Sequence, residues 1–187
     1  IKDFGNIILD VKQGKEDEFW YATWGNSNIG VTKYNIKTNQ RKTYSKGEGD
    51  NTLPTNNIHH ILVEGDSVWI TTDGAGICLI NDVTGKVTSK LNSQSSLFSE
   101  ENPQWANYIM RDSKGRLWVC TSDGIVCHQN DERRIYTLND KKETLAQNEA
   151  KMCFCDSKER IWLITTTGGL NIFNEGKQSF TSPFDEY

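Results

Sequence analysis

Short runs of apolar residues alternate with polar, turn-forming segments along the whole chain. β-Branched and aromatic residues fill the runs, whereas Gly, Asn, Asp and Ser dominate the intervals between them. No long segment has apolar positions at the helical spacing that marks an amphipathic helix. The pattern therefore predicts an all-β protein of short strands and many turns, and it excludes a helical bundle.

One short segment recurs four times: a large apolar residue, Trp, two variable residues and Thr. A Gly and an apolar residue follow it, an apolar stretch ending in an acid precedes it, and an apolar or aromatic anchor comes later. Such self-similarity is typical of repeat arrays. The tryptophans are Trp20, Trp69, Trp118 and Trp162, the acids are Asp10, Glu64, Asp112 and Asp156, and the anchors are Tyr44, Val87, Tyr136 and Phe180.

Each repeat is expected to fold as an antiparallel meander of four strands, which we call a, b, c and d in chain order. Strand a ends at the acid, strand b carries the Trp, and strand c begins at the Gly. One such sheet cannot bury both of its faces, so the sheets are expected to stack about an axis as the blades of a β-propeller. The predicted blades cover residues 5–46, 56–91, 106–138 and 150–184.

A four-bladed ring is the smallest closed propeller, and neither end of the chain offers a spare strand to seal one. The chain also begins at Ile1 rather than Met, which is typical of a processed or excised piece. We therefore expect residues 1–187 to be a partial propeller with two open blade faces.

The stretch from Asp112 to Ile125 reads D-x-x-G-x-L-W-x-x-T-x-x-G-I, and it resembles the two-component regulator propeller repeat. The fourth unit is similar, with Glu159 in place of the usual Gly. The resemblance implies seven-bladed propellers in the periplasmic sensor of hybrid two-component regulators, which are anchored in the inner membrane and include a histidine kinase. Many such sensors in polysaccharide-degrading bacteria detect oligosaccharides.

For this chain, the resemblance implies a non-enzymatic sensory segment with periplasmic localisation, and it suggests that the parent protein is a homodimer. Its expected partners are an oligosaccharide ligand and the neighbouring blades of the parent protein. No cofactor is expected. The 21 Lys and Arg and 25 Asp and Glu are scattered and give a net charge of −4, which argues against a nucleic-acid partner. No apolar run is long enough to cross a membrane, so no membrane contact by this segment is expected.

Ligand-binding residues are expected on the side of the propeller where the b–c and d–a loops emerge. Trp24 and Trp105 lie in these loops, outside the repeat positions, and a flat aromatic ring beside polar side chains suits a sugar. The alternative is that both rings only pack over the blades. The candidate ligand-binding residues are Trp24, Asn26, Asn28, His59, Asp73, Trp105 and Asp123.

No catalytic or metal-binding site is expected. His59 and His60 are adjacent in a strand and point to opposite faces, so they cannot easily share a metal ion. The acids recur at equivalent repeat positions, which indicates structural work in turns rather than glycosidase chemistry. Five cysteines lie in predicted strands, where free thiols behave as small apolar residues: Cys78, Cys120, Cys127, Cys153 and Cys155.

Two other functions remain open on this architecture. Asn28-Ile29-Gly30-Val31 faintly resembles an element of streptogramin-lyase propellers, but no His or Glu stands out in a b–c loop as an acid or base. A general protein-interaction propeller is the other alternative, although the sequence marks of WD40 repeats are missing.

Overall fold

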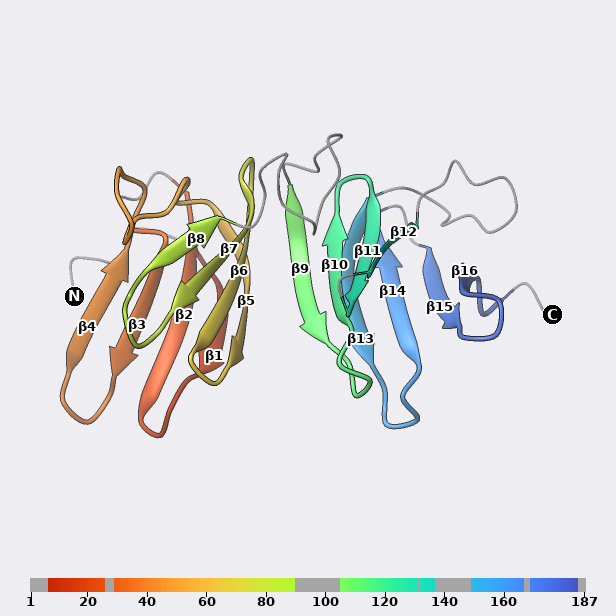
Figure 1. Ribbon diagram of the computed structural model, residues 1–187, viewed down its shortest axis with the longest axis horizontal. Helices are drawn as coiled ribbons and strands as arrows, with labels where there is room; N and C mark the ends of the chain where they lie inside the picture. The colour runs from red at the N-terminus through yellow and green to blue at the C-terminus, as the bar shows by residue number, and fades with distance from the viewer. Residues whose placement is uncertain are drawn as a thin grey trace. The chain divides into compact units, whose positions relative to one another are not determined.

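The computed structural model describes residues 7–25, 29–89, 105–130, 132–136, 149–166 and 169–184. All its regular elements are strands, and they form four antiparallel sheets of four strands each, in sequential order (Figure 1). The fold is therefore all-β, as the alternation of apolar runs and turns predicts. By internal contacts the chain divides into two units, which are described separately.

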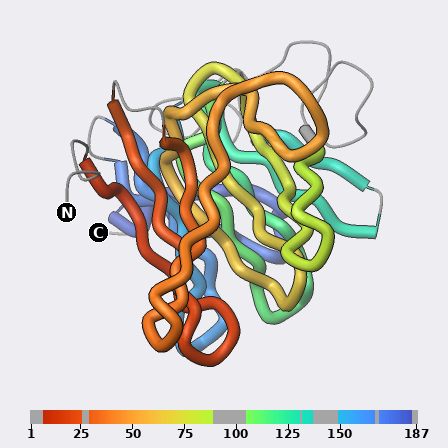
Figure 2. The backbone as a smooth tube through the Cα atoms, turned by 90° about the vertical axis from the view of Figure 1, so that its left-hand side faces the viewer, coloured from red at the N-terminus to blue at the C-terminus, as the bar shows by residue number. Residues whose placement is uncertain are grey.

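The first unit contains two sheets, which the tube in Figure 2 shows as up-and-down meanders. The strands of the first sheet are β1 (Ile7–Gln13), β2 (Glu18–Trp24), β3 (Val31–Asn35) and β4 (Gln40–Tyr44). Those of the second sheet are β5 (Ile58–Glu64), β6 (Ser67–Thr72), β7 (Gly76–Asn81) and β8 (Val87–Ser89). One apolar core joins the two sheets, with Trp20 and Tyr44 from the first and Ile61 and Ile70 from the second.

The second unit also contains two sheets. The third sheet consists of β9 (Ala106–Arg111), β10 (Leu117–Thr121), β11 (Gly124–Gln129) and β12 (Glu132–Tyr136). The fourth consists of β13 (Ala150–Cys155), β14 (Ile161–Thr165), β15 (Leu170–Asn174) and β16 (Ser179–Thr181). The apolar core of the second unit surrounds Trp118 of β10. The rings of Phe173 and Phe180 contact the Trp118 ring edge-on, with centroids 5.1 and 5.9 Å away.

The acid of the repeat shapes the a–b turn. In the third sheet Asp112 accepts hydrogen bonds from the backbone N–H groups of Lys114 and Arg116, at 3.0 and 2.9 Å, and from the indole of Trp118 at 2.8 Å. Asp156 does the same in the fourth sheet, with the indole of Trp162 at 2.9 Å. The acid therefore accepts hydrogen bonds from the turn backbone and from the Trp indole together, which explains why the two residues recur as a pair.

The Thr of the repeat closes the b–c turn at its base. Its hydroxyl donates to the carbonyl oxygen of the Gly that starts or precedes strand c: Thr72 to Gly76 at 2.9 Å and Thr121 to Gly124 at 2.9 Å. The equivalent bond joins Thr165 to Gly169 at 3.2 Å. In the first sheet Thr23 and Gly30 make it across a longer interval, at 3.2 Å.

The expectation that Asp10 is a turn acid is wrong. β1 continues to Gln13, so Asp10 lies inside the strand, opposite Ala22. The ladders show why: Asp10, His60 and Met152 are each paired with the residue two places after the repeat Trp. Each also follows a β-bulge in its strand a, and a bulge redirects the side chains beside it.

The cysteines lie inside strands, and all five carry free thiols, four of them buried. Burial, and then the neighbouring Cys153 thiol, raise the pKa of Cys120 well above its usual range. The thiolate is the reactive form of a cysteine, so a buried thiol with a raised pKa is inert.

We expect N-ethylmaleimide to modify Cys120 and Cys153 in the native chain at least about tenfold more slowly than the half-buried Cys155. Mass spectrometry of timed samples measures the three rates, and urea should abolish the difference between them. Equal native rates at Cys120 and Cys155 would contradict the packing described for the second unit.

Candidate ligand-binding site

Two of the expected ligand-binding residues lie side by side in the first unit. Trp24 is the last residue of β2 and His59 is the second residue of β5, and their ring centroids are 4.7 Å apart with the planes tilted by 47°. His59 reaches this position because it occupies the bulge between Ile58 and His60, outside the regular ladder. Trp24 and His59 are both half-buried, so the pair is not closed off from solvent.

The other expected residues are spread along the chain. The half-buried Asp73 lies in the b–c turn of the second sheet, where its backbone N–H donates to the carbonyl of Asn57 at 3.0 Å. Trp105 directly precedes β9 and is 53% exposed. Asp123 is exposed in the b–c turn of the third sheet, which belongs to the second unit. Asn26 and Asn28 lie outside the described residues.

The turn carboxylates are not suited to acid–base catalysis. Burial would raise the pKa of Asp112, but the hydrogen bonds from Trp118 and Arg116 outweigh it and hold the pKa below its usual value. The indole of Trp162 is the largest of the effects that hold the pKa of Asp156 well below the usual range. A glycosidase acid needs the opposite, a raised pKa.

A buried polar contact between the first two sheets was not expected from the sequence. His60 Nε2 lies 3.4 Å from Asp10 Oδ2, and the same carboxylate oxygen accepts the backbone N–H of Ile61 at 2.8 Å. Burial lowers the pKa of His60 to about 4; Asp10 opposes this shift, and Lys12 adds to it. The bulges in β1 and β5 bring the two side chains together, and no local sequence pattern signals them.

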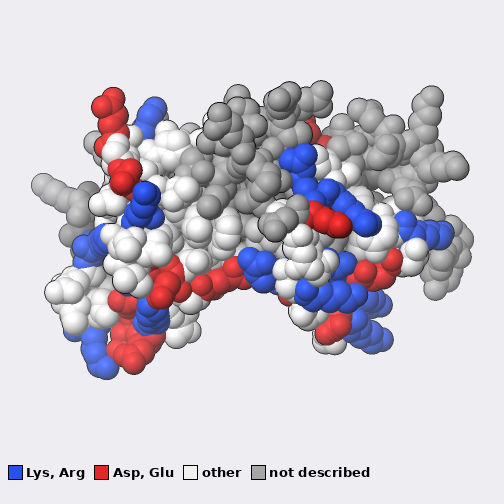
Figure 3. All heavy atoms as spheres, viewed as in Figure 1, with Lys and Arg blue, Asp and Glu red and all other residues white. Residues whose placement is uncertain are grey.

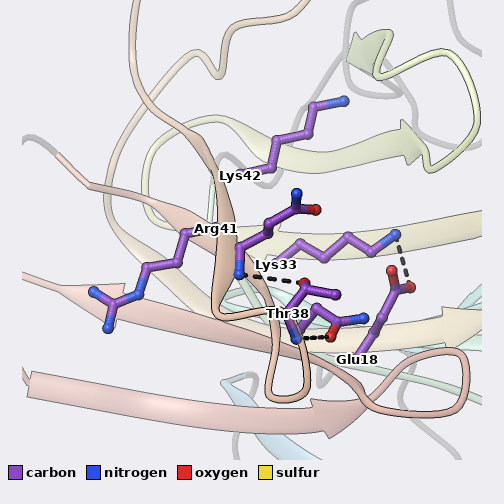
Figure 4. A pocket seen from close by; sticks show the side chains of 7 residues that line it. Glu18, Lys33, Thr38, Arg41 and Lys42 are labelled. Carbon is purple, nitrogen blue, oxygen red and sulfur yellow. Dashed lines mark hydrogen bonds and ion pairs between the residues drawn. The ribbon is translucent and has the colours of Figure 1, made fainter.

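A cavity of about 520 Å³ lies on the first sheet, and none of the expected ligand residues lines it. Figure 4 shows Lys33 reaching towards Glu18, 2.8 Å away, while Arg41 points outwards. Lys33 also binds Asp82 at 2.8 Å, and Arg41 and Lys42 lie over the rings of Tyr34 and Tyr44. Lys33, which lines this cavity, is already bound by two carboxylates, so its charge is balanced within the chain.

Charges of both signs are interleaved among the described residues on the face shown in Figure 3. In the part of the chain that the structure describes, no three His, Cys, Asp or Glu residues are grouped to hold a metal ion. The same residues include no helix of the length and apolarity that a membrane span requires.

Comparison with known proteins identifies the repeat. A family model described as two component regulator propeller matches residues 101–123, which include the turn acid and Trp of the third sheet. Histidine kinase P4 of Formosa agariphila is 22% identical over 171 residues, which are 89% of this chain and 12% of the kinase.

Solved structures agree on the fold. The extracellular domain of a protein described as a hybrid two-component system from B. thetaiotaomicron has a TM-score of 0.76 at 19% identity, over 97% of this chain and 25% of that one. The WD40 β-propeller domain of Doa1 has a TM-score of 0.61 at 16% identity, over 90% of this chain and 51% of that domain. The chain thus spans only part of the proteins it matches. Its four sheets are β-propeller blades, and residues 101–123, which include β9 and β10 of the third of them, match the two component regulator propeller model.

Proposed function

We propose that the chain is a non-enzymatic, ligand-binding segment of an extracytoplasmic sensor propeller, and that its ligand is an oligosaccharide. The parent is then a hybrid two-component regulator that is dimeric, anchored in the inner membrane and periplasmic in its sensor. Two relatives support this context, since one is named a histidine kinase and the other is the extracellular domain of a regulatory system. Residues 1–187 are on this proposal one section of a larger propeller.

The observation that carries the ligand class is the pairing of Trp24 with His59. An aromatic face provides apolar stacking for a sugar ring, and neighbouring polar groups bind its hydroxyls. The other residues proposed to bind ligand are Asn26, Asn28, Asp73, Trp105 and Asp123. The lyase alternative has less support, because the turn carboxylates Asp112 and Asp156 are already bound by turn N–H groups, a Trp indole and an Arg side chain.

Titration with a broad panel of oligosaccharides, followed by tryptophan fluorescence and calorimetry, tests the proposal. For a glycan that binds, Trp24→Ala should raise the Kd by about tenfold, since one lost stacking contact costs roughly 1.4 kcal/mol. Tyr34→Ala removes an aromatic ring near the other end of the first sheet and should leave the Kd unchanged. Silence across the whole panel would overturn oligosaccharide sensing and favour the protein-interaction alternative.

A further inference from the structure

The c–d turn of one sheet binds a cation on its neighbour in both described units. In the first unit Asp82, which follows β7, binds Lys33 of the first sheet at 2.8 and 3.0 Å. In the second unit Glu175, which follows β15, binds Arg116 of the third sheet at 2.6 and 3.1 Å. The same turn position therefore makes the same kind of contact twice.

Each of these two acids also lies close to a second cation, a lysine of the neighbouring sheet's a–b turn. Lys114 Nζ lies 2.8 Å from Glu175, and Lys15 Nζ lies 3.8 Å from Asp82. Each acid is thus held by one lysine of an a–b turn and by a second cation, which is Lys33 of β3 in the first sheet and Arg116, directly before β10, in the third. We call the two cations a cation cradle and the c–d turn carboxylate its acid. Two-pronged binding of a carboxylate by Arg also fixes its orientation.

The fourth sheet carries the same cradle. Lys158 and Arg160 stand where the third sheet has Lys114 and Arg116. The local geometry is matched too, since Arg160 Nε lies 2.6 Å from Asp156 just as Arg116 Nε lies 2.6 Å from Asp112. The environments differ: the Arg160 side chain is 47% exposed, whereas that of Arg116 is 8% exposed.

Apolar side chains surround this second cradle. Cross-strand partners share a face of a sheet, so Phe154 with Trp162 and Met152 with Ile164 lie on the face that carries Arg160. Phe154, Met152 and Ile164 are exposed by 45, 38 and 37%. On the third sheet the equivalent Trp118 is fully buried by Phe173 and Phe180 of its neighbour. A contiguous apolar patch of this kind is typical of an interface.

We propose that the Arg160 face of the fourth sheet binds a further propeller repeat, whose c–d turn places an Asp or Glu in the Lys158–Arg160 cradle. The partner also brings apolar side chains from its strands c and d, as β15 and β16 do for the third sheet. We choose this partner on charge complementarity. Lys158 and Arg160 are the counterparts of Lys114 and Arg116, which bind Glu175 on the third sheet.

The first sheet of this chain does not match that partner. Asn35 accepts the backbone N–H groups of Lys37 and Thr38 in its c–d turn, as Asn81 accepts those of Val83 and Thr84 in the second sheet. The turns are therefore equivalent, and Ile36 stands in the first where Asp82 stands in the second. If the fourth sheet packed against the first, Ile36 rather than an acid would lie against Lys158 and Arg160, and that turn would offer the two cations no carboxylate to bind.

The test compares the 187-residue chain with an extended chain in which a second copy of residues 137–187 follows Thr181. The copy supplies its own Glu175 after a connection as long as the one that precedes β13. Phenylglyoxal modification, located by mass spectrometry, reports the exposure of Arg160 against that of Arg116, and sedimentation reports the mass. In the original chain we expect a monomer in which Arg160 reacts about tenfold faster than Arg116.

In the extended chain the rate at Arg160 should fall to within about twofold of that at Arg116. A matched extended chain whose added copy carries Glu175→Gln should keep Arg160 reactive. Equal Arg160 rates in the Glu and Gln versions would overturn the proposal. Slow modification of Arg160 in the original chain would also overturn the proposal. If modification is slow at every protein concentration, the fourth sheet is closed on the first sheet. If modification is slow only at high concentration, the partner is a second copy of the chain.

Discussion

Replacing Trp118 with alanine should lower the free energy of unfolding by about 4 kcal/mol, within the range of roughly 3 to 5 kcal/mol for a buried Trp or Phe. The side chain is fully buried, contacts the rings of Phe173 and Phe180, and lies under the guanidinium of Arg116, 5.0 Å from its ring centroid. The substitution leaves a cavity and also removes an indole donor from Asp112. Urea unfolding followed by circular dichroism measures the loss.

Trp162→Ala is the matched control, because Trp162 holds the same repeat position and donates the same hydrogen bond to Asp156. It is only half-buried, so its removal should cost about 1 kcal/mol, mostly from the lost hydrogen bond. Similar losses for the two variants would show that Trp162 is covered as fully as Trp118 in solution.

The second large effect is a loss of stability in mild acid, governed by His60. Its pKa is about 4 in the folded chain, against an ordinary value of 6.5, so between these values the unfolded chain binds more protons. Stability is therefore fully present above pH 6.5 and is lost as the pH falls towards 4. We expect a loss of about 2 kcal/mol at pH 5 and about 3 kcal/mol at pH 4 from this residue.

His60→Met separates this effect from the titration of carboxylates, since Met152 occupies the equivalent position in the fourth sheet. The variant should unfold at the same urea concentration at pH 7 and pH 5, whereas the native chain should unfold earlier at pH 5. Carboxylates titrate mainly below this window. A native chain with equal midpoints at the two pH values would contradict the buried, neutral state of His60.

The four sheets could be predicted from the sequence because the bonds that define a repeat are local. Asp112 and Trp118 are six residues apart, and Thr121 bonds to Gly124 three residues on. Each repeat therefore carries its own turn signals, which survive substitutions such as Glu159, whose φ is +60°, where the third repeat has Gly115. The error at Asp10 arose where a bulge and a longer strand replaced these local bonds.

Contacts between sheets could not be predicted in the same way. Lys33 and Asp82 are 49 residues apart and Asp10 and Ile61 are 51 apart, and a single sequence gives no information on such pairs. For the candidate site, Trp24 and His59 could each be selected from the sequence by their positions near the b–c and d–a loops. That their rings contact each other depends on the bulge in β5, which the apolar pattern does not reveal.

The threonine hydroxyl at the base of each b–c turn has a consequence for how such proteins diverge. The bond closes a connection in which Thr and Gly are three residues apart in the third sheet and seven apart in the first. The fold thus tolerates b–c loops of unequal length, while strands b and c, which they connect, keep their register. New specificities can then arise by inserting or exchanging residues in one loop, at little risk to folding.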